Sequence, residues 1–224
     1  MRILINGFNG SMGQAIRAQC KMESDIKAED FKAEEINLSN ISAVIDFSSP
    51  EEFVFSLKFC TENKLPLISG TTGLTNEHLN LINSAKKSIP ILIASNMSLG
   101  IANLKNAIEH YLSSINATSK CKIGEILHTN KKDSPAGTAR EILRFLEHLP
   151  KRKIDGPIEV QSHRIGNIFG IHRVKFENKE GITIFKHIAT SRKVFVKSAL
   201  QATRWITSKE TGEYNFADFL NKKL

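Results

Sequence analysis

A short window in the middle of the chain brings together a titratable imidazole, two ammonium groups and a tight turn. It runs from Glu125 to Ala139 and contains His128, Lys131, Lys132 and the sequence Pro135-Ala136-Gly137-Thr138. A positioned imidazole or ammonium group can donate a proton to a reacting atom, and the amides at a helix start attract an anion. The combination predicts a site that reduces or protonates a small anionic substrate.

The turn in this window is expected to open a helix. Thr138 and Glu141 have the Thr-x-x-Glu spacing of a capping box, in which two side chains satisfy backbone amides at the helix start. Gly137 and Thr138 are therefore predicted to form a helix cap and also to bind a carboxylate. The alternatives are a solvated surface lysine at Lys131 and a structural histidine at His128.

A second informative stretch lies near the start of the chain. It is a glycine-rich turn with the sequence Gly7-Phe8-Asn9-Gly10-Ser11-Met12-Gly13. Glycines let backbone amides approach phosphate oxygens, as in the pyrophosphate loop of a dinucleotide-binding fold. The spacing is G-x-x-G-x-x-G rather than the strict G-x-G-x-x-G, so an ordinary strand-to-helix turn is the alternative interpretation.

A carboxylate that binds the cofactor ribose is expected at the end of the second strand. Both Glu29 and Asp30 occupy that place, and Lys32 follows as a group able to meet a 2′-phosphate. Solvated surface charge is the alternative for all three. The sequence therefore predicts NADH or NADPH as cofactor without choosing between them.

The elements that must position these groups alternate over the first hundred residues. Apolar runs predict strands at 2–6, 26–30, 41–47, 65–69 and 89–94. Helical spacing, including a proline suited to the first turn at Pro50, predicts helices over 10–22, 50–61 and 75–87. This rhythm predicts an α/β fold with a doubly wound, Rossmann-like parallel sheet, whose ligands bind at the carboxyl ends of the strands.

The pattern changes after Met97 and predicts a second domain of α+β type. Helices are expected over 101–112 and 139–149, and strands over 122–127, 170–176 and 182–189. Ile182, Ile184 and Ile188 are interpreted as an ordinary strand core. We predict domains over residues 1–97 and 98–193, with a C-terminal helix over 194–224 that returns to the first domain.

Composition narrows the class of protein. The net charge of +8 is spread among acids, and short runs such as Lys151-Arg152-Lys153 carry no interleaved aromatics, so we expect no nucleic-acid partner. Cys20, Cys60 and Cys121 form no ligand spacing or disulfide framework, which fits a reducing cytoplasm and predicts no metal site. The apolar start ends at Asn6-Gly7, so neither a signal peptide nor a membrane segment is expected.

Several motifs occur in one order along nearly the whole chain. After the glycine turn come Ile45-Asp46-Phe47-Ser48, Ser69-Gly70-Thr71-Thr72-Gly73, Ala94-Ser95-Asn96-Met97-Ser98-Leu99-Gly100, the Glu125-to-Ala139 window, Gly166-x-x-x-Gly170-x-His172 and His187-x-Ala189-x-Ser191-Arg192. In this order the set resembles the dihydrodipicolinate reductases (4-hydroxy-tetrahydrodipicolinate reductases) of bacterial lysine and diaminopimelate biosynthesis.

The resemblance implies an NAD(P)H-dependent reductase of a cyclic dicarboxylate imine, with a mixed open sheet in the second domain that builds a homotetramer. By matching motifs, Lys131 is the proton donor, and Gly137 and Thr138 bind a substrate carboxylate. His128 is predicted to be both a catalytic and a substrate-binding residue. The implied pyrophosphate contacts are Gly7, Phe8, Asn9, Gly10, Ser11 and Met12. Those bordering the nicotinamide are Gly70, Thr71, Thr72, Ala94, Ser95, Asn96 and Met97.

The chain departs from the family pattern at three positions. Leu127 stands where the family has the first of two adjacent histidines, Ala136 replaces the serine of the Pro-Ser-Gly-Thr turn, and Ser11 replaces an arginine. Two alternatives therefore accompany the reductase prediction: a catalytically weak dinucleotide-binding sensor or scaffold, and a reductase of another small carboxylate. His172 and His187 are interpreted as sheet-face or subunit-interface residues, and Arg192 as a group that reaches a carboxylate.

Overall fold

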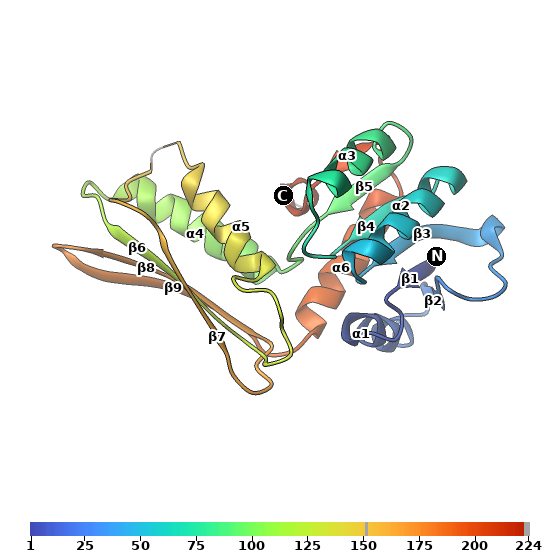
Figure 1. Cartoon of the computed structure of the whole chain (residues 1–224), viewed down its shortest axis with the longest axis horizontal. Helices are drawn as coiled ribbons and strands as arrows, with labels where there is room; N and C mark the ends of the chain where they lie inside the picture. Colours follow the sequence, from blue (N-terminus) through green and yellow to red (C-terminus); the bar gives the residue numbers. More distant parts are fainter. Residues whose placement is uncertain (151, 222–224) are drawn as a thin grey trace. The chain divides into compact units, whose positions relative to one another are not determined.

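The computed structural model of the chain describes residues 1–150 and 152–221 and divides into two compact units (Figure 1). Among the described residues, the first unit contains 1–97 together with 192–221, and the second lies within Ser98–Ser191. Lys151 of the basic run, and residues 222–224 of the C-terminal helix predicted from the sequence, lie outside the described residues.

The first unit is built on a six-stranded parallel sheet. Its strands are β1 (Arg2–Asn6), β2 (Lys27–Asp30), β3 (Ile41–Asp46), β4 (Leu67–Ser69), β5 (Pro90–Ile93) and β10 (Gly212–Tyr214), in the order β10-β5-β4-β3-β1-β2. From β1 the chain moves to one side for β2 and to the other for β3, so the strand order reverses at the carboxyl end of β1. Ligands bind at such a reversal in open α/β sheets.

Side chains that alternate along β1 anchor helices on both faces of this sheet. Ile3 and Ile5 pack in one buried cluster with α1 (Ser11–Cys20) and α6 (Lys193–Ile206). Leu4 packs on the other face with α2 (Pro50–Asn63) and α3 (Asn76–Ala85). A short 3₁₀ turn, η1 (Leu38–Asn40), leads into β3. The predicted α/β fold with a Rossmann-like sheet is confirmed.

The C-terminal region differs from the single helix predicted over residues 194–224. Helix α6 ends at Ile206, and the chain then forms β10 and a short helix α7 (Phe216–Asn221). Tyr214 and Phe219 pack edge-on against Trp205, with ring centroids 5.4 and 5.9 Å away. These aromatic contacts stabilise the turn that ends the helical run. Within residues 1–150 and 152–221, no helix is long and apolar enough to cross a membrane.

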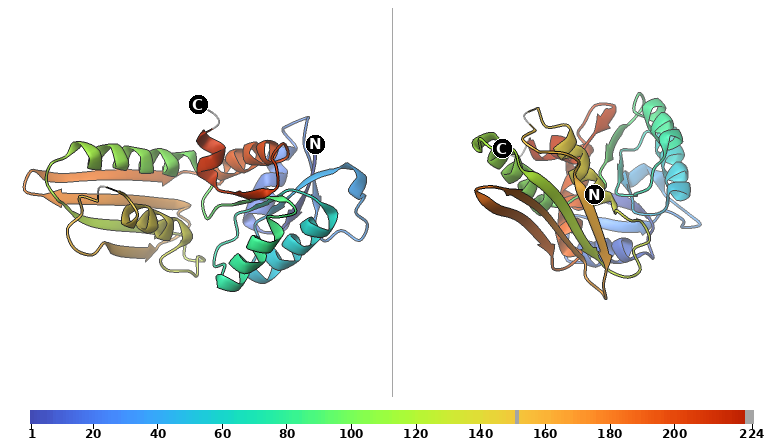
Figure 2. Two further views of the ribbon diagram at one scale, coloured as in Figure 1. Left: turned by 90° about the horizontal axis from the view of Figure 1, so that it is seen from above. Right: turned by 60° about the vertical axis from the view of Figure 1, so that its left-hand side comes forward.

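The second unit is a four-stranded mixed sheet covered on one face by two helices. The elements are α4 (Leu99–Ser114), β6 (Lys120–Leu127), α5 (Gly137–Glu147), β7 (Glu159–Arg164), β8 (Gly170–Asn178) and β9 (Gly181–Ala189), and the strand order is β7-β6-β8-β9. Only the β6–β7 pair among these is parallel. Figure 2 shows α4 running along β9. Strand β7, with the polar sequence Glu-Val-Gln-Ser-His-Arg, was not expected from the sequence.

The interpretation of the β9 isoleucines as strand core is wrong. Ile182, Ile184 and Ile188 are 56, 53 and 49% exposed. The two helices cover only the opposite face, where Phe185 packs with Phe176 and α4. Alternating side chains point to opposite faces of a strand, so the isoleucines lie on the uncovered face.

Candidate active site

The glycine turn joins β1 to α1 at the point where the strand order reverses. Gly7 has a φ of +80°, and a Cβ at this position would overlap the carbonyl oxygen of Phe47. A Cβ on Gly13 would overlap the carbonyl of Gly7. Helix α1 has Gly10 as its N-cap residue and no side-chain cap. The turn therefore has a packing reason for its glycines and also presents helix-start amides to a ligand.

The two candidate ribose acids have different surroundings. Glu29 accepts two hydrogen bonds from the Arg2 guanidinium, from Nε and Nη2, each 2.8 Å long. Asp30 lines a cavity of about 260 Å³ together with the glycine turn, Lys32 and Ser48. Lys32 Nζ lies 2.8 Å from a Glu52 carboxylate oxygen. The structure thus brings Asp30, rather than Glu29, to the same cavity as Gly7–Gly10.

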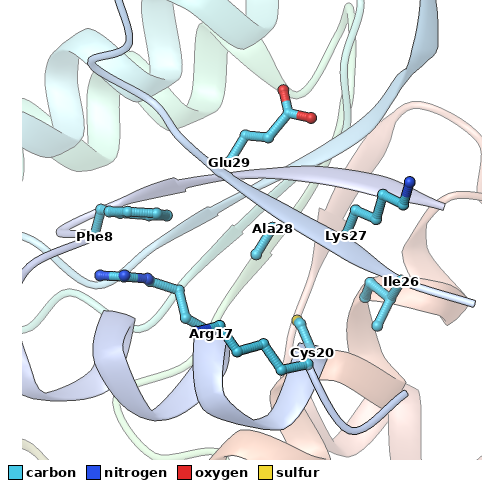
Figure 3. A pocket seen from close by; sticks show the side chains of 8 residues that line it. Phe8, Arg17, Cys20, Ile26, Lys27, Ala28 and Glu29 are labelled. Atoms are coloured by element: carbon cyan, nitrogen blue, oxygen red, sulfur yellow. The ribbon is translucent and has the colours of Figure 1, made fainter. Parts of the chain in front are cut away.

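A second cavity, of about 400 Å³, lies beside the edge strand β2 (Figure 3). Arg17 places its guanidinium carbon 4.1 Å from the centre of the Phe8 ring, and Figure 3 shows the two planar groups facing each other. Cys20 also lines this cavity, and burial raises the pKa of its thiol to about 11. The thiol therefore stays protonated and is no nucleophile, whereas Arg17 is a permanent cation beside Phe8.

Asp46, at the carboxyl end of β3, organises the loops that follow β3 and β4. It is fully buried and accepts hydrogen bonds from the hydroxyls of Ser48, Ser69 (2.8 Å) and Thr71 (2.6 Å). Thr71 Oγ1 in turn accepts a bond of 3.1 Å from the Ser48 amide. Burial raises the pKa of Asp46, and the hydroxyl bonds oppose that rise only in part. One carboxylate thereby fixes the two loops that follow β3 and β4.

The predicted nicotinamide loops follow two neighbouring strands. Gly70 lies against the Phe47 ring, where a Cβ would overlap the ring carbons. The amide of Ala94 donates a 3.0 Å hydrogen bond to the Ser69 carbonyl, and Met97 is buried in the cluster that joins the sheet to α6. Since β4 and β5 are paired in parallel, the loops 70–72 and 94–97 start from the same edge of the sheet.

In the second unit, Lys131 lies in the loop between β6 and α5. Its Nζ is 2.9 Å from Asp133 Oδ1, and the other oxygen of Asp133 is 3.4 Å from Arg140 Nη2. Burial alone would raise the pKa of Asp133, but the hydrogen bond and charge of Lys131, together with Arg140, lower it. Lys131 and Asp133 are half-buried, so the ammonium group is oriented by a partner while still reaching solvent.

The same loop is tied to a buried carboxylate, Glu125, on β6. Glu125 Oε1 accepts hydrogen bonds from the Ala136 amide (3.0 Å) and from Arg164 Nη2 (3.1 Å). Arg164, at the end of β7, also donates from Nε to the Lys131 carbonyl (3.0 Å) and from Nη2 to the Asp133 carbonyl. Lys131 and the start of α5 are therefore held by one connected network.

The predicted capping box at Thr138 and Glu141 is wrong. Helix α5 begins at Gly137, its N-cap residue is Ala136, and no side chain caps it. Thr138 lies inside the first turn, one residue after the helix has started, and Glu141 Oε1 accepts a 2.6 Å bond from Lys105 Nζ on α4. By contrast, α2 and α4 are capped by the hydroxyls of Ser49 and Ser98. The start of α5 keeps the amide geometry that suits a carboxylate.

The histidines occupy different environments. His128, half-buried, begins the loop, and its carbonyl accepts a 3.1 Å bond from the Lys131 amide. His172 is buried on β8, with Nε2 3.9 Å from Glu125 Oε2, and His187 is its cross-strand partner. Burial lowers the pKa of His172 to about 4, against the opposing effect of the Glu125 charge. His172 and His187 lie on a face of the sheet, as predicted. Arg192 is the N-cap residue of α6 in the first unit.

Reasoning from the sequence did not assign roles to the residues that organise these loops. Asp46 ends an apolar strand at the cofactor edge, which is a usable signal because buried acids rarely occur without partners. Glu125 gives a comparable signal, because it is an acid among the apolar residues near the end of β6. Arg164 gave no such signal, since its partners, the Glu125 carboxylate and the carbonyls of Lys131 and Asp133, lie more than 30 residues away in sequence.

Comparison with protein families matches both units. The family model described as dihydrodipicolinate reductase, N-terminus, matches residues 19–97, and the one described as dihydrodipicolinate reductase, C-terminus, matches residues 100–220. The 4-hydroxy-tetrahydrodipicolinate reductase of Campylobacter lari is 35% identical, over 98% of this chain and 99% of that protein. The protein of the same name from Alkaliphilus oremlandii is 34% identical, over 99% of each chain.

Solved structures agree at the level of the fold. A dipicolinate-bound dihydrodipicolinate reductase from Paenisporosarcina sp. TG-14 has a TM-score of 0.70 at 17% identity, over 96% of this chain and 97% of that one. A probable dehydrogenase from Thermotoga maritima has a TM-score of 0.64 at 12% identity, over 98 and 92% of the two chains. Identities this low establish a shared fold and nothing finer.

Proposed function

This chain belongs to the dihydrodipicolinate reductase family, and we propose that it reduces a cyclic dicarboxylate imine with hydride from a nicotinamide cofactor. The resemblance drawn from the sequence motifs is thereby confirmed. The proposed substrate is the dihydrodipicolinate/4-hydroxy-tetrahydrodipicolinate of lysine and diaminopimelate biosynthesis, and the product is tetrahydrodipicolinate. Residues 1–97 with the returning C-terminal elements are the proposed dinucleotide-binding part, and residues 98–191 the proposed substrate-binding part.

The observation that carries this proposal is the joint anchoring of Lys131 and the start of α5. A substrate with two carboxylates and a reducible C=N bond needs an anion site and a proton donor held in fixed relation. Ala136, at the start of α5, and the backbone of Lys131 are tied to Glu125, one directly and the other through Arg164. That arrangement provides both parts within the second unit.

The residues of the second unit have complementary proposed roles. Loss of water from 4-hydroxy-tetrahydrodipicolinate gives dihydrodipicolinate, in which a C=C bond is conjugated to the imine. Hydride delivered to the far carbon of that C=C bond moves an electron pair toward the imine, and Lys131 Nζ supplies the proton that the reduced intermediate takes up. The amides around Gly137 and Thr138 bind a substrate carboxylate at the positive end of the α5 dipole. His128 is a substrate contact beside them. Asp133, which touches Lys131 Nζ, orients the ammonium group toward its task.

The first unit has the features that a nicotinamide dinucleotide requires. The start of α1, without a side-chain cap, suits the pyrophosphate next to Gly7, Phe8, Asn9, Gly10, Ser11 and Met12. The loops at Gly70, Thr71, Thr72, Ala94, Ser95, Asn96 and Met97 are the proposed border of the nicotinamide. When bound, the reduced nicotinamide supplies the hydride.

We further propose NADH as the preferred cofactor. Asp30 lines the cavity of the glycine turn, where its carboxylate can accept hydrogen bonds from a ribose 2′-hydroxyl and would repel a 2′-phosphate. Lys32 is paired with Glu52, and Ser11 offers no positive charge. We expect Asp30→Ala to weaken NADH binding about tenfold, roughly one strong hydrogen bond. Glu29→Ala is the matched control and should leave it within about twofold.

Fluorescence titration of the wild-type protein and both variants with NADH and NADPH checks this choice. Tighter binding of NADPH than NADH by the wild-type protein would contradict it and would direct attention to Arg17, the cation stacked on Phe8 in the neighbouring cavity.

The proposed assembly is a homotetramer formed through the second unit. Ile182, Ile184 and Ile188 form an exposed apolar row on β9, a type of surface that proteins usually cover with a partner. Light scattering of the purified protein measures the mass directly, and a monomer at micromolar concentration would rule out this assembly. The buried free thiols of Cys20, Cys60 and Cys121 fit the proposed cytoplasmic location.

A direct assay tests the proposed activity. The loss of near-ultraviolet absorbance of reduced nicotinamide should depend on freshly generated 4-hydroxy-tetrahydrodipicolinate and on the enzyme. Tight cofactor binding without oxidation would instead favour a dinucleotide sensor. Oxidation with other small carboxylates but not with this imine would favour a reductase of different specificity.

A further inference from the structure

We infer that Arg164, together with Glu125, is a positioning device that sets the loop carrying Lys131 against the start of α5. The inference rests on the proposed function for its effect on turnover. Its structural part, that Arg164 orders the loop between β6 and α5, stands independently of any activity.

The guanidinium of Arg164 reaches two points of that loop at once. Its Nε donates to the Lys131 carbonyl at 3.0 Å and its Nη2 donates to the Asp133 carbonyl. These two residues flank Lys132, and their side chains form the 2.9 Å ion pair between Lys131 and Asp133. Arg164 therefore holds the backbone of both partners of the ion pair, and the planar guanidinium fixes the angle between them.

Glu125 connects this loop to the substrate side of α5. Its Oε1 accepts from Arg164 Nη2 at 3.1 Å and from the Ala136 amide at 3.0 Å, so one oxygen is shared by the loop and the helix start. Glu125 is fully buried and the Arg164 side chain is 19% exposed. In such surroundings a charge-assisted bond is stronger than one between exposed groups, because little water screens it.

The position of Arg164 and Glu125 explains why they should affect turnover and not only the stability of the fold. Arg164 donates neither to the Lys131 ammonium nor to the α5 amides; it holds the carbonyls of Lys131 and Asp133 and, through Glu125, the Ala136 amide before the helix. A shift of about 1 Å in a proton donor can reduce turnover on the order of a hundredfold without any loss of fold. Arg164 is thus a positioning residue that acts through Lys131.

A matched control lies between the same two strands. Lys122 on β6 and Glu159 on β7 form an exposed ion pair of 2.6 Å, remote from the loop in strand register. Glu159→Gln changes one charged side chain of the β6–β7 strand pair, and Arg164→Lys changes another. A general weakening of this ladder would affect both variants, whereas loss of positioning would affect only the second.

The first test follows backbone amide exchange in the full-length protein. The amides of Thr129, Lys131 and Ala136 are hydrogen-bonded to Gly166, His128 and Glu125, which protects them. In Arg164→Lys, which keeps the charge but loses the planar fork, we expect these three amides to exchange at least tenfold faster. The strand amides should keep their rates. Unchanged exchange at all three positions in the folded variant would overturn the inference.

The second test measures kcat, KM and cofactor affinity. Arg164→Lys should lower kcat at least twentyfold while NADH affinity stays within about twofold, because the cofactor loops lie in the other unit. Guanidinium ion added to Arg164→Ala should restore kcat at least fivefold, whereas ammonium ion should not. A folded Arg164→Lys with kcat within twofold of wild type, or an equal loss in Glu159→Gln, would refute the role.

Two further outcomes separate this inference from the proposed function. If wild-type protein shows no turnover, the proposed function fails, while the exchange comparison still decides whether Arg164 orders the loop. If Arg164→Ala does not fold, Arg164→Lys and Glu125→Gln take its place. Glu125→Gln keeps an acceptor but loses the charge, and we expect a kcat loss smaller than that of Arg164→Lys.

Discussion

Each unit of this protein has a buried carboxylate near the end of an inner strand, but the two carboxylates are satisfied in different ways. Asp46 in the first unit is surrounded by hydroxyl donors from Ser48, Ser69 and Thr71. Glu125 in the second unit is bound by a guanidinium and a backbone amide. Both carboxylates are fully buried, so the difference lies in their donors.

The difference matches the ligand proposed for each unit. Hydroxyl donors order the loops around Asp46 without adding charge, and the phosphates of a dinucleotide can be left to backbone amides. In the second unit, the cations of Lys131, Arg140 and Arg164 accompany the acids Glu125 and Asp133, which leaves one positive charge in excess for a dianionic substrate. In the proposed function, the first network orders loops for cofactor binding, and the second orders a charged group for reaction.

Removing Lys131 should give the largest effect and is the sharpest test of this division. We expect Lys131→Ala to lower kcat at least about a hundredfold, the range for loss of a general acid. Cofactor affinity should stay unchanged because Lys131 belongs to the other unit. Steady-state kinetics combined with NADH titration measures both quantities, and normal turnover by this variant would remove Lys131 from the reaction.

Lowering the pH should change the stability of the two units in opposite directions. Burial lowers the pKa of His172 from 6.5 to about 4, so between these values the unfolded chain binds more protons than the folded one. The stability of the second unit should therefore rise as pH increases across this window, by up to ~3 kcal/mol, and be lost as pH falls through it. The pKa of His187 is also lowered by burial and adds to this slope.

Asp46 should give the reverse slope in the first unit. Burial raises the pKa of Asp46 above its ordinary 3.8, so the folded state binds more protons than the unfolded one just above that value. Its contribution to stability is therefore fully present below pH 3.8 and decreases as pH rises through the raised pKa. Fluorescence of Trp205, the single tryptophan, reports unfolding of the first unit. Amide exchange in β8 reports unfolding of the second unit.

The variants Asp46→Asn and His172→Gln identify the groups responsible for these slopes. Asp46→Asn should remove the slope of the first unit, His172→Gln should reduce that of the second unit to the part due to His187, and each should leave the slope of the other unit unchanged. Equal slopes in both variants and in the wild-type protein would show that other groups dominate the titration.

The smallest predicted effect is that of Asp46→Asn on cofactor binding. The amide keeps the size of the carboxylate, but its NH₂ group cannot accept from Ser69 and Thr71, so their hydroxyls must turn to accept instead. We expect about tenfold weaker NADH binding, which corresponds to ~1.4 kcal/mol, and kcat within twofold. A loss of kcat with unchanged NADH affinity would contradict the division between the networks.

Much of the fold could be predicted because the spacing of apolar residues and the positions of turn-forming residues indicated the same elements. Strand β1, for example, alternates Ile3 and Ile5 with Leu4, and its predicted limits match the structure. The signal failed where a long-range contact decides the local structure. Near the end of α6, Trp205 packs against Tyr214 and Phe219 from the segment that follows. Strand β7 has a mostly polar sequence and is an edge strand because it pairs with β6. The exposed β9 isoleucines were interpreted as core because the sequence of a strand shows which residues share a face. It does not show which face is covered.

For the candidate site, the sequence indicated which residues carry chemistry but not what holds them. Lys131, Gly137 and Thr138 could be assigned from one contiguous window, and they remain proposed site residues. The capping box failed because the helix starts at Gly137, two residues earlier than a cap at Thr138 requires. Glu29 and Asp30 could not be separated by position alone, and Arg2 makes the distinction by pairing with Glu29.

The return of the chain to the first unit has a consequence for how the protein is made. The second unit is one continuous stretch, Ser98–Ser191, and can close as soon as it has left the ribosome. The first unit lacks α6 and β10 until residues 193–214 are synthesised, so part of one face of its sheet and the outer edge of β5 stay open meanwhile. The nascent cofactor-side sheet is therefore the part of this chain with the longest exposure to misassembly.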